Sequence, residues 1–248
     1  MPANAASQAT EAAETARLEA HRFPPFENGD RMDQATFHRR YRRMPEDVKA
    51  ELLGGIVSMA SPVSIEHGTL DHTIGLWFGT YAVRTPGLRA AANATIILGT
   101  KDEPQPDQCL FIEARRGGRS RIERIVGEKS SYLFGPPEMV AEIAASSRSR
   151  DLHLKRRRYY LAGVEEYLVL LPRGRRAWWF VRGESAFAAM PADADGVFRS
   201  RLFPGLWLDA AALFAEDAAA LLAMLEKGLA TPEHATFVAA LAASAPPA

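Results

Sequence analysis

The sequence predicts an α/β fold, in which a β-sheet carries helices on its faces. Three observations support this prediction. The apolar runs at residues 138–145 and 166–171 have the length of buried strands. Between them, residues 151–162 have the length of a helix, and Gly163 is placed to end it. An order of strand, helix and strand is typical of sheets whose faces are covered by helices.

The elements predicted in the N-terminal half begin at Asp33, a residue type that often caps the first turn of a helix. Residues 51–59 place a glycine pair between two apolar runs and predict a hairpin. A helix is predicted over residues 64–80 because it carries regularly spaced apolar side chains. A strand is predicted over residues 94–98, and a polar loop over 99–106 follows it.

The elements predicted in the C-terminal half begin with a strand over residues 107–112. Residues 115–129 are charged and contain glycines, so they predict an excursion on the surface. A strand pair is predicted over 176–182 and 185–190, and Asp209 is predicted to cap a C-terminal helix. We therefore expect a flexible tail over residues 1–30, a core domain over 31–208 and a C-terminal helical segment over 209–248, packed on the core.

The composition is that of an ordinary globular protein. Among 248 residues, lysine plus arginine and aspartate plus glutamate both number 30, so the formal net charge is zero. Neutrality argues against a protein that coats nucleic acid by bulk charge, although a local basic groove is compatible with it. Cys109 is the single cysteine, which excludes an internal disulfide and a cysteine-rich metal site. We expect a cytoplasmic protein with neither a signal peptide nor a membrane span.

Glu142 is the most informative residue for function. It lies in the middle of an apolar predicted strand, and a carboxylate is costly to bury unless it is paired or binds a cation. Asp107 opens another predicted strand directly after Pro106. Two carboxylates on neighbouring strands can hold one hard divalent cation. The alternatives are a strand glutamate that faces water at a sheet edge and an aspartate that serves only the turn.

Lys155 lies one turn into the helix predicted over 151–162. Its spacing from Asp151 favours an ion pair on the helix surface, which contributes only a few tenths of a kcal/mol. In the alternative, Lys155 lies beside Glu142, where an ammonium group could orient a water or stabilise charge on a phosphate. Two further candidates are Glu51 and His67. Glu51 is either a third acidic group near the metal or a solvated charge. His67 either contacts the substrate or is an ordinary helix histidine.

Basic residues gather around the predicted site. Arg148, Arg150 and Arg156 flank Lys155 and could contact the phosphates of a nucleic acid, although such runs usually form a solvated face. Similar runs occupy residues 39–43 and 115–121. The sequence contains no P-loop, no Gly-x-Gly-x-x-Gly motif and no zinc-finger spacing. These absences exclude several common classes of nucleotide and DNA-binding protein.

An ordered set of short motifs runs from about residue 32 to residue 171. Its members are Glu51-Leu52-Leu53-Gly54-Gly55, Ser61-Pro62 with His67, Asn93-Ala94-Thr95, Gln105-Pro106-Asp107, the run 136–143, Ser146-Ser147, Asp151 with Lys155, and Ala162-Gly163-Val164-Glu165-Glu166-Tyr167. Taken together, this set resembles the Uma-two endonuclease family, a branch of the PD-(D/E)XK nuclease superfamily. No single motif in it is specific, whereas the order is.

The resemblance implies a restriction-endonuclease-like fold, with a central mixed β-sheet flanked by helices, an N-terminal helix and a C-terminal helical tail. It also implies metal-dependent hydrolysis of DNA phosphodiester bonds, with Mg²⁺ held by Asp107, Glu142 and the backbone carbonyl of Ile143, and with Mn²⁺ as a possible substitute. The superfamily lysine would stand at position 144, which is alanine here. By family resemblance Lys155 takes over that role, and Glu51 matches an acidic residue ahead of the core strands.

The same resemblance makes a homodimer plausible. Two departures from the family pattern are Gly54, where many relatives carry aspartate, and Ile56, at or beside a position that is often acidic. Family membership alone does not establish catalysis. A binding or dimeric interaction module on the same fold, and an enzyme that acts on another phosphate-containing substrate, are the alternative functions.

Overall fold

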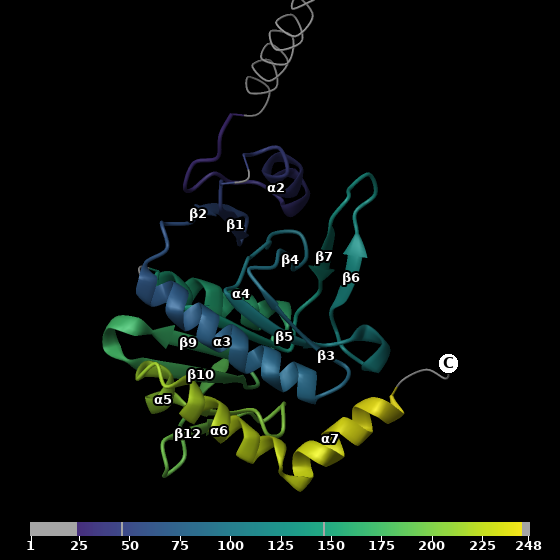
Figure 1. Cartoon of the computed structure of the whole chain (residues 1–248). Helices are drawn as coiled ribbons and strands as arrows, with labels where there is room; N and C mark the ends of the chain where they lie inside the picture. Colours follow the sequence, from purple (N-terminus) through teal and green to yellow (C-terminus); the bar gives the residue numbers. More distant parts are fainter. Residues whose placement is uncertain (1–23, 46, 146, 245–248) are drawn as a thin grey trace, which may run out of the picture.

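The computed structural model of the protein describes residues 24–45, 47–145 and 147–244 (Figure 1). Of the flexible tail predicted over residues 1–30, residues 1–23 therefore lie outside the described residues. The described part of that segment includes Phe26, whose ring stacks on that of Phe37 with 5.0 Å between the centroids. No helix in the described ranges is long and apolar enough to cross a membrane.

Within the described residues, the largest sheet has six strands in the order β11-β10-β9-β8-β5-β3. The pair β8–β9 is parallel and the other neighbours are antiparallel, so the sheet is mixed, as predicted. The strands are β3 (Leu88–Ala92), β5 (Gln108–Ile112), β8 (Met139–Ile143), β9 (Glu166–Leu171), β10 (Arg176–Arg182) and β11 (Phe187–Met190).

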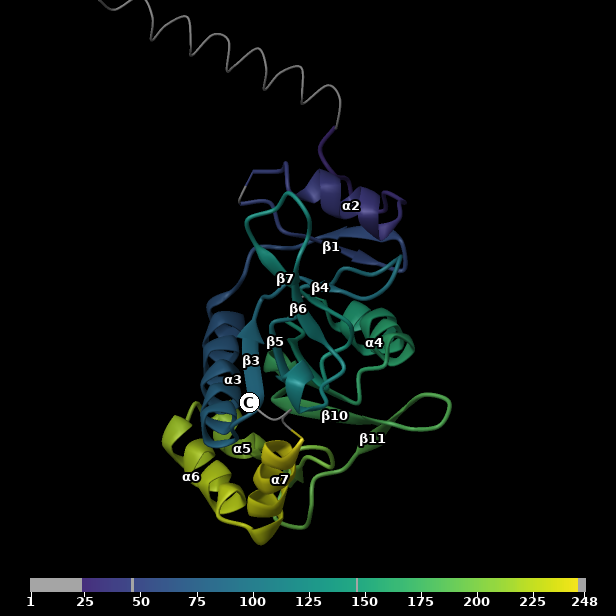
Figure 2. The same ribbon diagram turned by 90° about the vertical axis from the view of Figure 1, so that its right-hand side faces the viewer.

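Helices cover both faces of this sheet, as the sequence predicts. Apolar side chains of α3, α5, α6 and α7 pack on one face. On the other face, α4 packs together with a small sheet of β4, β7 and β6 (Figure 2). These elements are α3 (Ile65–Arg84), α4 (Arg156–Ala162), α5 (Ala210–Phe214), α6 (Ala218–Leu229), α7 (Pro232–Ala243), β4 (Ile96–Ile97), β6 (Arg121–Arg124) and β7 (Ser131–Phe134).

Strand β8 has the alternation that the sequence predicts. Ala141 and Ile143 belong to the core under α3, whereas Val140 and Ala144 belong to the core under α4. Alternate residues of a strand point to opposite faces. Glu142 therefore points to the α4 face of the sheet, between two apolar neighbours.

Residues 24–59 form a separate unit, which we call the N-terminal lobe, beyond one end of the sheet (Figure 1). The lobe contains α2 (Gln34–Tyr41), β1 (Ala50–Leu53) and β2 (Ile56–Met59), and it has an apolar cluster of its own. Asp33 caps α2 by accepting the backbone N–H of Thr36 at 2.7 Å, as predicted. The predicted hairpin turn is formed by Gly54 and Gly55, with φ angles of 64° and 80° that suit glycine.

Two sequence predictions differ from the structure. In place of the strand predicted over 94–98, β4 holds only two residues, and the preceding β3 joins the main sheet. The alanines of β3 have low strand propensity, and pairing along β5 outweighs it. The excursion predicted over 115–129 contains β6, whose residues are all exposed and so lack the alternation of a strand that is buried on one face.

The remaining short elements connect these layers. They are the 3₁₀ turns η1 (Ala114–Arg116) and η3 (Pro172–Gly174), the π-helix η2 (Arg150–Lys155), and the strand pair of β12 (Val197–Arg199) and β13 (Trp207–Asp209). The helix predicted over 151–162 thus begins as η2 and continues as α4, and Gly163 ends it with a φ of 104°, as predicted.

Candidate active site

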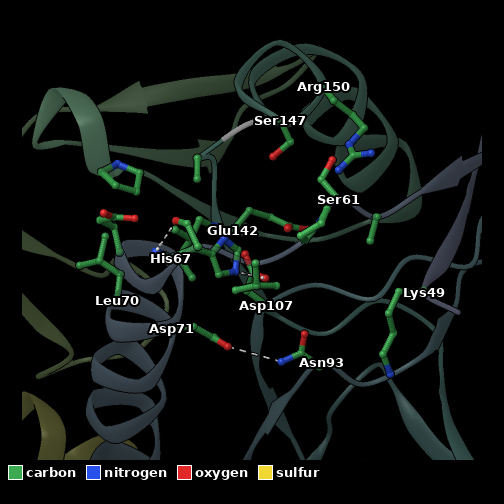
Figure 3. A pocket seen from close by; sticks show the side chains of 18 of the residues that line it. Lys49, Ser61, His67, Leu70, Asp71, Asn93, Asp107, Glu142, Ser147 and Arg150 are labelled. Carbon is green, nitrogen blue, oxygen red and sulfur yellow. Dashed lines mark hydrogen bonds and ion pairs between the residues drawn. The ribbon is translucent and has the colours of Figure 1, made fainter. Parts of the chain in front are cut away.

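A cavity of about 760 Å³ opens at the end of the main sheet where β5 begins and β8 ends. Its walls come from β1, the segment between β2 and α3, the first turns of α3 and the start of η2 (Figure 3). Its ionisable floor residues, as we name them here, are Glu51, His67, Asp71, Asp107, Glu142 and Lys155. The cavity therefore brings together the carboxylates and the lysine that the sequence singles out.

Asp107 and Glu142 are cross-strand neighbours. In the antiparallel pair β5–β8, Gln108 opposes Ala141, and continuing this register by one residue opposes Asp107 to Glu142. Opposed residues have Cβ atoms about 5 Å apart. The Oδ2 atom of Asp107 accepts the backbone N–H of Ile143 at 2.6 Å, which fixes the carboxylate against β8. Glu142 is thus held on β8, and Asp107, directly before β5, is tied to β8 by this hydrogen bond.

Lys155 pairs with two carboxylates from other parts of the fold. Its Nζ atom lies 2.8 Å from Oε1 of Glu51 and 2.9 Å from Oε1 of Glu142. Lys155 and Asp151 are both buried, so the predicted ion pair on the helix surface is wrong. Burial lowers the pKa of Lys155, but the charges of Glu142, Glu51 and Asp151 outweigh it and raise that pKa, which keeps the ammonium group protonated.

Two residues on the same helical face as Lys155, Asp151 and Tyr159, contribute to the site in ways that were not predicted from the sequence. Asp151, Lys155 and Tyr159 occur at every fourth position, and all three are buried. The hydroxyl of Tyr159 donates to Oε1 of Glu142 at 2.7 Å. Asp151 accepts a hydrogen bond from Ser147, and its Oδ1 atom has no hydrogen-bond partner among the described residues. The four-residue spacing of Asp151, Lys155 and Tyr159 could have indicated that their side chains share one face of the helix.

His67, in the first turn of α3, lies against Asp107. Its Nε2 atom is 3.1 Å from Oδ1 of Asp107. The hydrogen bond with Asp107 raises the pKa of His67 and outweighs the effect of burial, and the charges of Asp107 and Asp71 and the backbone of Ile143 add to the increase. A positively charged imidazole is thus stabilised beside Asp107 and the backbone of Ile143.

The floor carries more acid than base. Burial raises the pKa of Glu142 well above its usual value; Lys155 opposes this effect, whereas Asp107, Asp151 and Glu51 add to it. Among the floor residues, the carboxyl groups of Glu51, Asp71, Asp107 and Glu142 face the ammonium group of Lys155 and the imidazole of His67. An additional cation would therefore be electrostatically favoured on this floor.

The donor set fits a hard divalent cation. Among the described residues, no group of three or more His, Cys, Asp or Glu side chains is arranged to hold a metal ion. Mg²⁺ does not need such a group, because it is usually bound by one or two carboxylates and keeps several waters. Asp107 and Glu142 could supply these carboxylates, and the raised pKa of the His67 imidazole indicates that positive charge is favoured beside Asp107.

The predicted basic residues lie in different environments. Arg150 lines the cavity and its guanidinium donates to the hydroxyl of Ser58. Among the described residues that line the cavity, neither Arg148 nor Arg156 occurs; Arg148 is exposed, and the guanidinium of Arg156 lies 4.9 Å from the ring centre of Phe180. The cavity instead gains three basic residues that the sequence analysis did not select, namely Lys49, Arg173 and Arg175.

A family model described as "Uma2: Putative restriction endonuclease" matches residues 35–211, which is more than half of the chain. The chain belongs to the Uma2 family. All floor residues lie inside the matched region. A search of curated proteins finds no match.

The fold of this Uma2 chain is similar to that of a solved structure from Anabaena variabilis, described as "a putative nuclease belonging to DUF820". The two chains are 15% identical, and the similarity covers 72% of this chain and 97% of that chain with a TM-score of 0.53. The likeness confirms the predicted mixed α/β fold, with a central sheet flanked by helices. Family and fold together support a nuclease.

Proposed function

We propose that the protein is an endonuclease that hydrolyses phosphodiester bonds of DNA with Mg²⁺, for which Mn²⁺ can substitute. The observation that carries the proposal is the opposed pair of carboxylates, Asp107 and Glu142, with the buried ammonium of Lys155 hydrogen-bonded to Glu142. Membership of the Uma2 family supports the reaction class.

The residues have distinct roles in this proposal. Asp107, Glu142 and the carbonyl of Ile143 would hold the metal ion. When bound, such an ion lowers the pKa of a coordinated water and offsets charge on the phosphate. Lys155 would stabilise the negative charge that develops on the phosphate, in a site from which bulk water is largely excluded.

Other residues of the cavity support these groups. Tyr159 orients the Glu142 carboxylate through the hydrogen bond to Oε1. Glu51 holds the Lys155 ammonium from the side of the N-terminal lobe. Arg150 would contact a substrate phosphate from the cavity wall, and His67 would bind the substrate next to Asp107. Arg148 and Arg156 remain predictions for the flanking DNA, and so do the homodimer and the cytoplasmic location.

Cleavage of plasmid and single-stranded DNA tests the proposal. We expect cutting of at least one of these substrates with Mg²⁺ or Mn²⁺ and none with EDTA, and we expect Asp107→Ala and Glu142→Ala to abolish it. The exposed carboxylate of β6 provides a matched control, because Glu123 is not among the described residues that line the cavity and Glu123→Ala should cut normally. Cutting that survives in Asp107→Ala and Glu142→Ala would refute the site. Metal binding without any cutting would instead support the binding module.

A further inference from the structure

We propose that the cavity takes a single nucleic-acid strand and rejects an intact duplex, so that the substrate is a single-stranded, frayed or flapped segment. This inference rests on the proposed function and specifies its substrate class. It combines the depth of the floor, the charge of the rim and the apolar side chains at the mouth.

The floor lies deep in the molecule. The exposed fractions of the side chains are 14% for Asp107, 5% for Glu142 and 3% for Lys155. The cavity volume of about 760 Å³ is that of a cube with edges of about 9 Å. The major groove of B-DNA is about 12 Å wide, and the whole duplex is wider than its groove. A duplex would therefore lie across the mouth with its phosphates held away from the floor. A single strand can bend into the cavity.

Segments from distant parts of the sequence meet in the lining of the cavity. One is the segment of residues 60–64 that joins β2 to α3, and another contains Pro172, Arg173 and Arg175 together with Phe214. The backbone carbonyl of Phe214 accepts a hydrogen bond from Arg175 at 2.6 Å, which ties the parts of this second segment together. A substrate that fills the cavity therefore contacts both segments.

The rim is basic although the floor is acidic. The rim is defined here by its more exposed lining residues, of which Lys49, Arg150, Arg173 and Arg175 are basic and Glu66 and Glu216 are acidic. In Figure 3, Lys49 and Arg150 lie to the right of Asp71 and Glu142. Basic side chains that surround a narrow channel can follow the phosphates of a single strand.

Apolar side chains at the mouth fit exposed bases. Val63 lines the cavity with 70% of its surface exposed. Phe214 is the aromatic residue among the described residues that line the cavity. Single-strand binding sites commonly combine a basic channel with aromatic side chains on which bases stack. A duplex keeps its bases stacked inside and cannot offer their faces.

Binding of one sequence as labelled single-stranded DNA, single-stranded RNA and blunt duplex DNA tests the inference. Fluorescence anisotropy with the wild-type protein in EDTA excludes cleavage during the measurement. We expect at least one single strand to bind about tenfold or more tightly than the duplex. The DNA and RNA arms identify which strand is preferred. Equal or tighter binding of the duplex, or no binding of any form, would overturn the inference.

A pair of valine variants tests the apolar mouth. We expect Val63→Ser to weaken single-strand binding about threefold and to leave duplex binding unchanged. Val83→Ser is the matched control, since it removes an exposed valine of α3 that does not line the cavity within the described residues. A mouth variant that binds single strands like wild type would contradict the inference.

Cleavage separates this inference from the proposed function. If the protein prefers single strands in EDTA but cuts nothing with Mg²⁺ or Mn²⁺, the proposed function fails and the assigned ligand stands. If it cuts blunt duplex as fast as single strands, the inference fails and the nuclease stands.

Discussion

Two buried glutamates on adjacent strands of one sheet have different surroundings. Glu142 on β8 is 4% exposed and Glu166 on β9 is 2% exposed. Glu142 is bonded to the ammonium of Lys155 and the hydroxyl of Tyr159, and it lines the cavity. Glu166 accepts hydrogen bonds from the indole of Trp179, the hydroxyl of Ser200 and the backbone N–H groups of residues 201 and 202.

The difference lies in the kind of partner. Burial raises the pKa of Glu166, and hydrogen bonds from neutral groups around it lower that pKa again. Three of these four donors belong to the segment of residues 200–202, so Glu166 attaches this segment to the sheet. The surroundings of Glu142 are charged, and neighbouring carboxylates raise its pKa further. A buried carboxylate is therefore a candidate for catalysis when acids surround it and a cavity reaches it, and burial alone is insufficient.

The largest expected effect separates these two glutamates by activity. Under the proposed function, Glu142→Gln should lower the cleavage rate by about 10³-fold, a typical loss when a preorganised charged group is removed. Glu166→Gln should cut at nearly the wild-type rate. Its free energy of unfolding should fall by about 2 kcal/mol, because an amide leaves some of the surrounding donors unpaired. Cleavage rates and urea unfolding of both variants measure the contrast.

Equal losses of activity in the two variants would remove the distinction between them. Circular dichroism of the folded variants provides the control for misfolding. A normal rate in Glu142→Gln would contradict the role of Glu142, whatever the stability of Glu166→Gln.

The second effect concerns the charge that distinguishes Glu142. Lys155→Met should lower the free energy of unfolding by about 3 kcal/mol, because it leaves the buried carboxylates of Glu51 and Glu142 without their cation. Lys129→Met, at an exposed position between β6 and β7, is the control and should change stability little. Urea unfolding measures both. Equal stability of the two variants would mean that the Lys155 pairs do not contribute to folding.

The contrast between the glutamates also shows what the sequence could and could not predict. Alternation along residues 138–145 predicted the face of Glu142, and the apolar run after Asp107 predicted the strand that became β5. The same reasoning cannot separate Glu142 from Glu166, because both follow apolar strand patterns. The partners of Glu142 come from η2 and α4, and most partners of Glu166 come from residues 200–202. Tertiary packing alone brings these segments to the sheet.

Lys155 and the basic rim were harder to place for the same reason. The spacing of Asp151 and Lys155 fits a surface ion pair, and the buried outcome depends on Glu51, which lies over a hundred residues earlier in the N-terminal lobe. Arg173 and Arg175 lie in the turn after β9, and their place at the cavity depends on where that strand ends beside α3 and Phe214. Local sequence patterns contain no information on such distant contacts.

A smaller effect is expected from metal binding. Mg²⁺ at about ten times its dissociation constant should stabilise the wild-type protein by about 1.4 kcal/mol, because it binds the folded state. The increase in thermal midpoint should persist in Glu166→Gln and disappear in Asp107→Asn, which weakens one arm of the carboxylate pair. Differential scanning fluorimetry with increasing Mg²⁺ measures it. An equal increase in Asp107→Asn would locate the metal elsewhere.

The smallest expected effect is a change of stability with pH, and it concerns two carboxylates, Glu103 and Glu128, that share the titratable side chain of His38. His38 of the N-terminal lobe lies 2.7 Å from Glu103 through Nδ1 and 3.3 Å from Glu128 through Nε2. Burial lowers the pKa of His38, but hydrogen bonds and charges of the two glutamates outweigh it, so the pKa is raised. The associated stability is fully present below the unfolded pKa of about 6.5 and is lost as pH rises through the higher folded value.

We expect this loss to be about 1 kcal/mol, because a neutral imidazole has a single N–H and leaves one glutamate without that donor. Urea unfolding of wild type and His38→Gln between about pH 6 and about pH 9 measures it. Because the other histidines are common to both proteins, the difference between the two curves isolates His38. A difference that stays constant with pH would show that His38 does not titrate between these glutamates. A difference that shrinks towards high pH would show that Glu103 and Glu128 have a partner whose charge depends on pH. Glu166 has neutral partners, and Glu142 has a partner that stays charged.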